Sequence, residues 1–96
     1  MKVVWTETAI AHLRSIHAYI AQDSVRYAQA TVDRLTRRSQ QIGRDPLSGG
    51  KVPEYDNEEI RELIESPYRL IYRIRTGQLD VIAVVHGARQ LPADLT

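Results

Sequence analysis

The sequence lacks cysteine altogether and has few glycines and prolines, and each shortage excludes a class of protein. Without cysteine the chain has no disulfide framework, no thiolate zinc site and no cysteine nucleophile. Five glycines and four prolines among 96 residues exclude collagen-like and low-complexity chains. No apolar run approaches the ~20 residues that cross a membrane, and the first residues lack the apolar region of a signal peptide. We therefore expect one small cytoplasmic domain over residues 1–96, with no metal, no cofactor and no membrane contact.

The net charge of +1 conceals an uneven distribution along the chain. Residues 1–51 hold 8 basic and 4 acidic side chains, residues 52–67 hold one arginine and six acids, and residues 68–96 hold four arginines and two aspartates. The three segments therefore carry +4, −5 and +2. Arginine greatly outnumbers lysine, and its planar guanidinium binds carboxylates and phosphates through paired hydrogen bonds.

The first half of the chain has the pattern of a strand followed by two helices. Lys2–Trp5 is β-branched and aromatic, which predicts a strand. Thr6 is a suitable N-cap for an amphipathic helix over residues 7–22, and Ser24 for a second helix that ends before Gly43. Because about two residues join them, the helices should form an antiparallel hairpin.

The second half changes to the alternating pattern of strands. After a predicted loop at 45–57, the segments 59–65, 68–75 and 78–86 are strand-like, and Thr76-Gly77 predicts a tight turn. The predicted fold class is therefore α+β, with an N-terminal strand and a helical hairpin packed on a three- to four-stranded antiparallel sheet.

The first group of candidate functional residues is basic. Arg34, Arg37 and Arg38 are spaced to form a ridge on the polar side of the second helix. Such a ridge serves either solubility or contact with nucleic acid or an acidic protein segment.

A second group combines residues from several strands. Phosphodiester cleavage needs cations together with a proton donor and acceptor, and Glu54, Arg61, Arg69 and His86 are residues of those types. Alternatively, the acids Glu54, Glu62 and Glu65 form ordinary ion pairs with these arginines across neighbouring strands.

Several short motifs together resemble those of the RelE/ParE superfamily, bacterial toxins of type II toxin–antitoxin pairs. They are Val4-Trp5-Thr6-Glu7, Pro46 with Gly49-Gly50, Val52-Pro53-Glu54, Ile60-Arg61-Glu62-Leu63, Tyr68-Arg69-Leu70-Ile71-Tyr72 and His86-Gly87-Ala88-Arg89. The family fold, a helical hairpin on an antiparallel sheet that begins with an N-terminal strand, agrees with the fold expected from the residues.

The resemblance implies a growth inhibitor that a cognate antitoxin neutralises in a hetero-oligomer, the antitoxin being small with an acidic binding segment. One branch of the superfamily, ParE-like, poisons DNA gyrase, and the other, RelE-like, cleaves messenger RNA on the ribosome. Members of the cleaving branch typically carry a histidine or tyrosine just past the last strand, and this chain has no tyrosine after Tyr72. The ending from His86 to Pro92 resembles the ParE-like branch instead. Gyrase poisoning is therefore favoured, without an enzymatic step.

In this interpretation the residues expected to bind the target or partner are Arg34, Arg37, Arg38, Lys51, Arg61, Arg69, Arg73 and Arg89, together with the C-terminal segment 89–96. The alternative is a metal-independent endoribonuclease that uses Glu54, Arg61, Arg69 and His86. A second alternative is a degenerate toxin that only binds its antitoxin.

Overall fold

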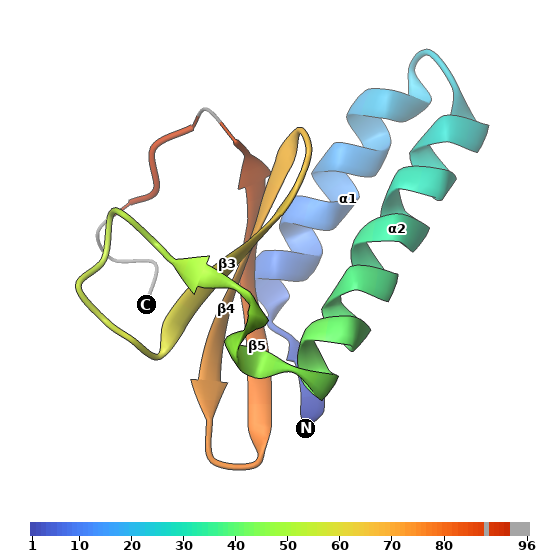
Figure 1. Ribbon diagram of the computed structural model, residues 1–96. Helices are drawn as coiled ribbons and strands as arrows, with labels where there is room; N and C mark the ends of the chain where they lie inside the picture. Colours follow the sequence, from blue (N-terminus) through green and yellow to red (C-terminus); the bar gives the residue numbers. More distant parts are fainter. Residues whose placement is uncertain (88, 93–96) are drawn as a thin grey trace.

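The computed structural model describes residues 1–87 and 89–92 and has the expected order of elements. These are β1 (Lys2–Trp5), α1 (Glu7–Ala21), α2 (Val25–Arg44), the short 3-10 helix η1 (Pro46–Ser48), β2 (Gly50–Lys51), β3 (Ile60–Glu65), β4 (Tyr68–Arg75) and β5 (Gln78–His86). The two helices lie side by side and cover one face of the sheet (Figure 1). The α+β class is confirmed.

Both predicted helix starts are confirmed, but the end of α2 differs from the prediction. The Thr6 hydroxyl oxygen accepts a hydrogen bond from the Ala9 amide at 3.2 Å, and Ser24 accepts one from Tyr27 at 3.0 Å. Gly43 does not end α2, which continues to Arg44. A Cβ at this position would lie 2.6 Å from Cγ2 of Val3. Gly43 is therefore the point of close approach between α2 and β1.

The sheet is larger than expected and is mixed. Its order is β1-β5-β4-β3-β2, five strands in which β1 runs parallel to β5 and the other pairs are antiparallel. The prediction of a three- to four-stranded antiparallel sheet was wrong in these two respects. The fifth strand is the two-residue β2, within the segment predicted as a loop, where Lys51 lies opposite Arg61. The parallel pair joins Lys2 to Gln78, a partner too distant in sequence for local patterns to reveal.

The sheet has an apolar cluster on each face. The cluster beneath the helices contains Ala9, Leu35, Ile42, Leu70, Tyr72, Leu79, Val81 and Val84. The cluster on the opposite face contains Val52, Ile60, Ile71, Ile82, Ala83 and Leu91. β5 contributes to both clusters and lies between β1 and β4, so it is an interior strand covered on both faces, as its nearly unbroken apolar sequence predicts.

Candidate functional site

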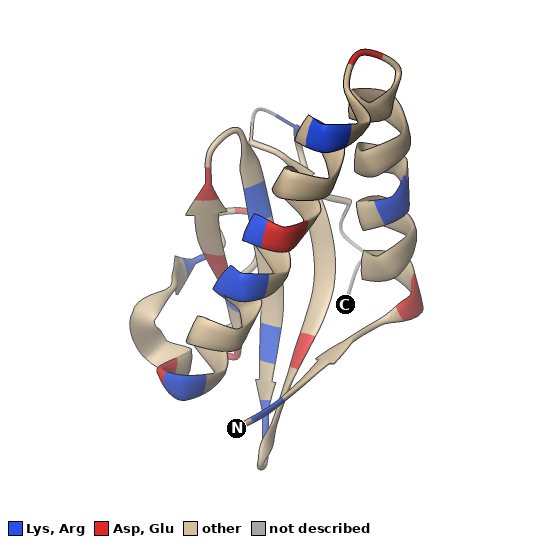
Figure 2. Ribbon diagram, turned by 90° about the vertical axis from the view of Figure 1, so that its right-hand side faces the viewer, with Lys and Arg blue, Asp and Glu red and all other residues tan. Residues whose placement is uncertain are grey.

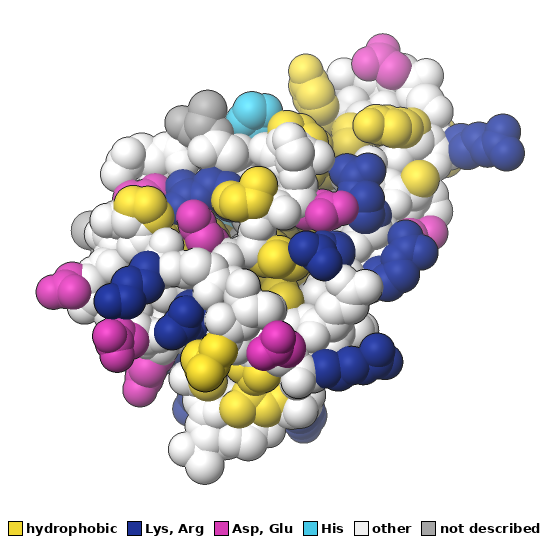
Figure 3. Space-filling model, viewed as in Figure 1, with side chains coloured by type: hydrophobic (Ala, Val, Ile, Leu, Met, Phe, Trp, Pro, Cys, Tyr) yellow, Lys and Arg dark blue, Asp and Glu magenta, His cyan; other side chains and the backbone are white. Residues whose placement is uncertain are grey.

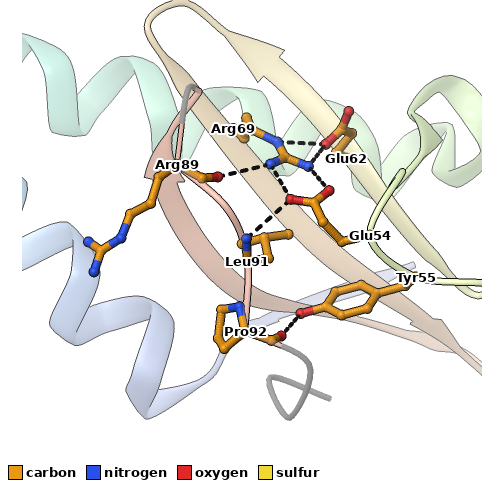
Figure 4. A network of polar contacts seen from close by, with 7 residues as sticks. All are labelled: Glu54, Tyr55, Glu62, Arg69, Arg89, Leu91 and Pro92. Carbon is orange, nitrogen blue, oxygen red and sulfur yellow. Dashed lines mark hydrogen bonds and ion pairs between the residues drawn. The ribbon is translucent and has the colours of Figure 1, made fainter.

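Arg69 forms a buried network with two glutamates on the face of the sheet opposite the helices (Figure 4). Its Nη1 and Nη2 donate to the two carboxylate oxygens of Glu54, each at 2.8 Å. Its Nε and Nη2 donate to Oε2 of Glu62 at 2.8 and 2.6 Å. Arg69 lies on β4 and Glu62 on β3, whereas Glu54 comes from the segment between β2 and β3. Since Arg69 is only 7% exposed, these charge-assisted bonds replace most of its contact with water.

The same network holds the segment that follows β5. Oε2 of Glu54 accepts a hydrogen bond from the Leu91 amide at 3.2 Å, and Nη1 of Arg69 donates to the Arg89 carbonyl at 3.3 Å. The Tyr55 hydroxyl donates to the Pro92 carbonyl. The Leu91 side chain is buried in the apolar cluster of this face. Residues 89–92 are therefore fastened across the sheet by polar and apolar contacts (Figure 4).

The ion pairs determine the protonation of Glu54. Hydrogen bonds from the Arg69 guanidinium, aided by the Leu91 amide, lower the pKa of Glu54 to about 2, although burial opposes this change. The hydrogen bonds that Arg69 donates to Glu54 and Glu62 raise the pKa of Arg69. At neutral pH Glu54 is therefore an ionised carboxylate with both oxygens occupied. It is poorly suited to general acid–base catalysis, which needs a pKa near the working pH.

Arg61 is not part of this network. It lies opposite Tyr72 in the pairing of β3 with β4, and its Nη1 donates to the Gly49 carbonyl at 3.0 Å. The Tyr72 hydroxyl accepts from the Gly49 amide at 3.1 Å and donates to the Pro46 carbonyl at 2.6 Å. Burial raises the pKa of Tyr72. Arg61 thus helps to fix the turn after α2, while Arg69 points to the other face.

His86 lies in a third place, at the end of β5. Its ring is edge-on to that of Tyr68, with the ring centres 6.2 Å apart. Both rings line a cleft of about 750 Å³ between α1 and the end of β5, together with His12 and Arg89. The Nδ1 of His12 accepts a hydrogen bond from the Val84 amide at 3.2 Å, and burial, then the positive charge of Arg89, lower the pKa of His12.

The four residues considered for RNA cleavage are therefore not assembled into one site. Glu54 and Arg69 are in contact, but they neutralise each other, while Arg61 and His86 lie elsewhere. The alternative interpretation was ion pairing across neighbouring strands. It holds for Arg69 on β4 and Glu62 on β3, which form such a pair.

The predicted ridge on α2 is divided between paired and unpaired arginines. Nε of Arg34 and Nε of Arg38 each lie 3.2 Å from a carboxylate oxygen of Glu65, whereas Arg37 is exposed. Glu65 thus pairs with the helix and not with an arginine of a neighbouring strand. Dark-blue side chains follow α2 along the right-hand side of Figure 3.

The remaining candidate cations occupy the surface of the sheet. Lys51 lies 3.4 Å from Glu58, and Arg73 lies 3.5 Å from Glu59, in pairs open to solvent. Arg89 is exposed beside the cleft. Of the predicted C-terminal binding segment, residues 93–96 lie outside the described residues.

The contributions of Tyr55 and Leu91 to the site were not anticipated. The only sequence signal was an apolar residue, Leu91, placed shortly after the last strand and before Pro92. An apolar residue at that position suggests that its side chain is buried, but not which part of the fold buries it. The pairing with Glu54 depends on the path of the chain and has no local signature.

Neither a metal centre nor a membrane span is found in the part of the chain that the structure describes. Residues 1–87 and 89–92 contain no group of three or more metal-binding side chains. Within the same ranges, neither helix is long and apolar enough to cross a bilayer.

Comparison with known proteins assigns the family. Residues 3–91 match the family described as the ParE toxin of the type II toxin–antitoxin system parDE. The chain is 32% identical over 89 residues to Toxin RelE2 of Caulobacter vibrioides, covering 92% of this chain and 97% of the relative. The fold is similar to that in the structure titled chromosomal ParDE TA system from P. aeruginosa, with a TM-score of 0.74 and 19% identity over 90% of this chain and 95% of the other. The protein thus belongs to the ParE toxin family, within the RelE/ParE superfamily, and is the toxin of a type II toxin–antitoxin pair.

Proposed function

We propose that this toxin inhibits bacterial growth by binding DNA gyrase and stabilising its cleaved complex with DNA, and not by cutting messenger RNA. In this proposal the protein acts without an enzymatic step of its own. Its working parts are surface cations and the fastened segment 89–92.

One observation carries the proposal: the arginine and the carboxylate that RNA cleavage would use neutralise each other. The Arg69 guanidinium is nearly enclosed and makes four hydrogen bonds to Glu54 and Glu62. A phosphate would have to displace two carboxylates to reach it, and the network carries a net charge of −1. Positive charge that stabilises a cleavage transition state must instead be directed at the phosphate.

The family membership implies an antitoxin as partner, and we extend this to its chemistry. The proposed antitoxin segment is acidic, because the toxin exposes Arg89 without a carboxylate partner among the described residues. Such a segment would fold on contact, offsetting the entropy of its ordering by burying apolar surface.

The test is a direct comparison of the two targets. Purified toxin is added to gyrase with supercoiled and relaxed plasmid, and in parallel to a translating ribosome with a defined message. We expect loss of supercoiling activity and accumulation of cleaved DNA, with the message intact. Addition of the cognate antitoxin should restore supercoiling.

His86→Ala serves as the control that separates the mechanisms. A proton-transferring histidine typically contributes ~10²–10⁴-fold to the rate, so the substitution would nearly abolish RNA cleavage. Gyrase poisoning should instead persist in this variant. Rapid cleavage of the message by the wild type, with gyrase unaffected, would overturn the proposal in favour of the ribosome-dependent nuclease.

A further inference from the structure

The outer face of α2 concentrates positive charge that nothing in the fold uses. The helix holds five arginines and one aspartate among its 20 residues. Two of the arginines are occupied by Glu65. The other three, Arg26, Arg37 and Arg44, are exposed and make no side-chain hydrogen bond or ion pair within residues 1–87 and 89–92. We call these three residues the α2 arginine row.

The α2 arginine row is straight because of its spacing. Arg44 follows Arg26 by 18 residues (44 − 26), which is five turns of a helix with about 3.6 residues per turn. Arg37 follows Arg26 by 11 residues and deviates by only about 20° around the helix axis. At about 1.5 Å per residue the row is about 27 Å long. Blue bands, which mark all five arginines of the helix, recur from one end of α2 to the other in Figure 2.

The surroundings of the row are polar and include three exposed acids: Asp33 within the row, Asp45 directly after Arg44, and Asp23 just before the helix. Asp33 lies between Arg26 and Arg37, and its Oδ1 accepts a hydrogen bond from Nε2 of Gln29 at 2.9 Å. The other side chains flanking the row are small or uncharged: Ala30, Gln40 and Gln41. The large exposed apolar side chains of α2, Val25 and Tyr27, lie in its first turn and about 100° around the helix axis from the row. The row itself therefore offers a folded protein partner no apolar anchor.

Negative charge gathers on another part of the molecule. The six acids of residues 52–67 belong to the β2–β3 connection and to β3, and the connection lies at the far side of the sheet from α2 (Figure 1). Glu65 is the exception, because it pairs with Arg34 and Arg38 of α2. Residues 25–44, with five arginines and one aspartate, nevertheless keep an excess of positive charge. Such a separation of charge orients a polyanion towards α2 as it approaches.

We infer that the α2 arginine row binds the phosphate backbone of duplex DNA. This inference rests on the proposed function, in which the toxin meets a gyrase–DNA complex, and it assigns the row to the DNA of that complex. Duplex DNA is stiff and carries one negative charge per about 1.7 Å, so guanidinium groups carried on a rigid helix can reach its phosphates without either partner having to fold. The contacts are to phosphates and not to base edges, so binding is independent of sequence.

Fluorescence anisotropy of the full chain with labelled 30-base-pair duplexes of two unrelated sequences tests this. The test variant replaces the row with glutamine (R26Q, R37Q and R44Q together), which keeps helix propensity and removes three charges. The control removes exposed charges elsewhere that make no ion pair among the described residues (K2Q and R14Q together). Affinities are measured between 50 and 200 mM salt, with an equal-charge poly-glutamate as competitor.

The expected result is salt-dependent binding of both duplexes by the wild type and by the control. In the row variant the slope of log K against log salt should become shallower by about 2.7, since each lost phosphate contact contributes about 0.9. The inference is overturned if the wild type binds no duplex at 50 mM salt, if both variants lose affinity equally, or if poly-glutamate displaces the DNA at equal charge.

The supercoiling assay separates this result from the proposed function. Suppose that the wild type poisons gyrase but the row variant binds DNA as tightly as the wild type does. In that case the inference about the row fails and the proposed gyrase target stands. If the row binds DNA as expected but the wild type leaves gyrase active, the proposed target fails and the DNA-binding surface stands.

Discussion

Arginine serves two different purposes on the two sides of this molecule. On the face of the sheet opposite the helices, Arg69 is 7% exposed and donates hydrogen bonds to two glutamates and a backbone carbonyl. On the outer face of α2, the three arginines of the row are exposed and have no partner among the described residues. The same residue type is thus part of the interior in one place and of the solvent-exposed surface in the other.

The difference shows that the environment of a cation, more than its identity, determines what it contributes. A buried guanidinium must have its donors satisfied, and its partners then lose their freedom to bind anything else. An exposed guanidinium contributes little to folding but keeps its donors available. Substitutions should therefore affect stability at Arg69 and partner binding on α2.

The largest expected effect comes from removing Arg69. In Arg69→Ala, Glu54 and Glu62 would be left buried side by side without a counter-charge. We expect the free energy of unfolding to fall by about 3–5 kcal/mol, measured by urea denaturation. Arg73→Ala, on the same strand with an exposed pair to Glu59, is the matched control and should cost less than about 1 kcal/mol. Equal losses in the two variants would contradict the distinction between buried and exposed arginines.

A second effect of the buried network should appear as acid sensitivity. The pKa of Glu54 is lowered from 4.5 to about 2 in the folded protein, so the unfolded chain binds a proton more readily. The stability that Glu54 contributes is therefore fully present above about pH 5 and is lost as the pH falls from about 4.5 to 2.

Unfolding free energies of the wild type and Glu54→Gln, measured between pH 7 and pH 2, check this. The difference between the two proteins should be constant near neutrality and should shrink across the acid range. A difference that does not change down to pH 2 would show that the carboxylate is not held in its ionised form.

A smaller effect is expected where α2 meets the sheet. Glu65→Gln removes the carboxylate shared by Arg34 and Arg38, whose side chains are about one-third exposed (34% and 36%). The loss should be below about 1 kcal/mol, because water already screens this pair. It should shrink further in 1 M salt, where the screening length is about 3 Å. A loss as large as that of Arg69→Ala, or one that resists salt, would place these pairs with the buried network.

The smallest effect on stability is expected from the α2 arginine row. The variant with glutamine at all three positions should unfold within about 0.5 kcal/mol of the wild type, because these exposed side chains make no hydrogen bond or ion pair within residues 1–87 and 89–92. Thermal denaturation followed by circular dichroism measures this. A marked drop in the melting temperature would mean that the row supports the fold.

Periodicity and capping residues predicted most of the fold. The spacing of apolar residues identified both helices, and Thr6 and Ser24 identified where they begin. These signals are local, because a helix and its cap are determined by residues three or four apart. Gly43 misled the prediction, since its lack of a side chain serves contact with Val3 and not the end of the helix.

The candidate site was predictable in its residue types but not in its arrangement. Glu54, Arg61, Arg69 and His86 are the types that cleavage chemistry uses, yet the strand register turns Arg61 towards Tyr72 and leaves Arg69 on the opposite face. Which carboxylate meets which guanidinium depends on contacts 15 or 7 residues apart in the chain. No local pattern encodes these pairings.

By itself, the sequence determined the helices, the strands, the excess of arginine and the resemblance to the toxin superfamily, because each of these depends on composition or on neighbouring residues. Only the tertiary structure decided which arginines are neutralised. That outcome depends on burial, and burial arises when distant segments such as Glu54, Arg69 and Leu91 meet. Desolvation then requires a buried charge to be paired, while the exposed charges of α2 remain free to bind.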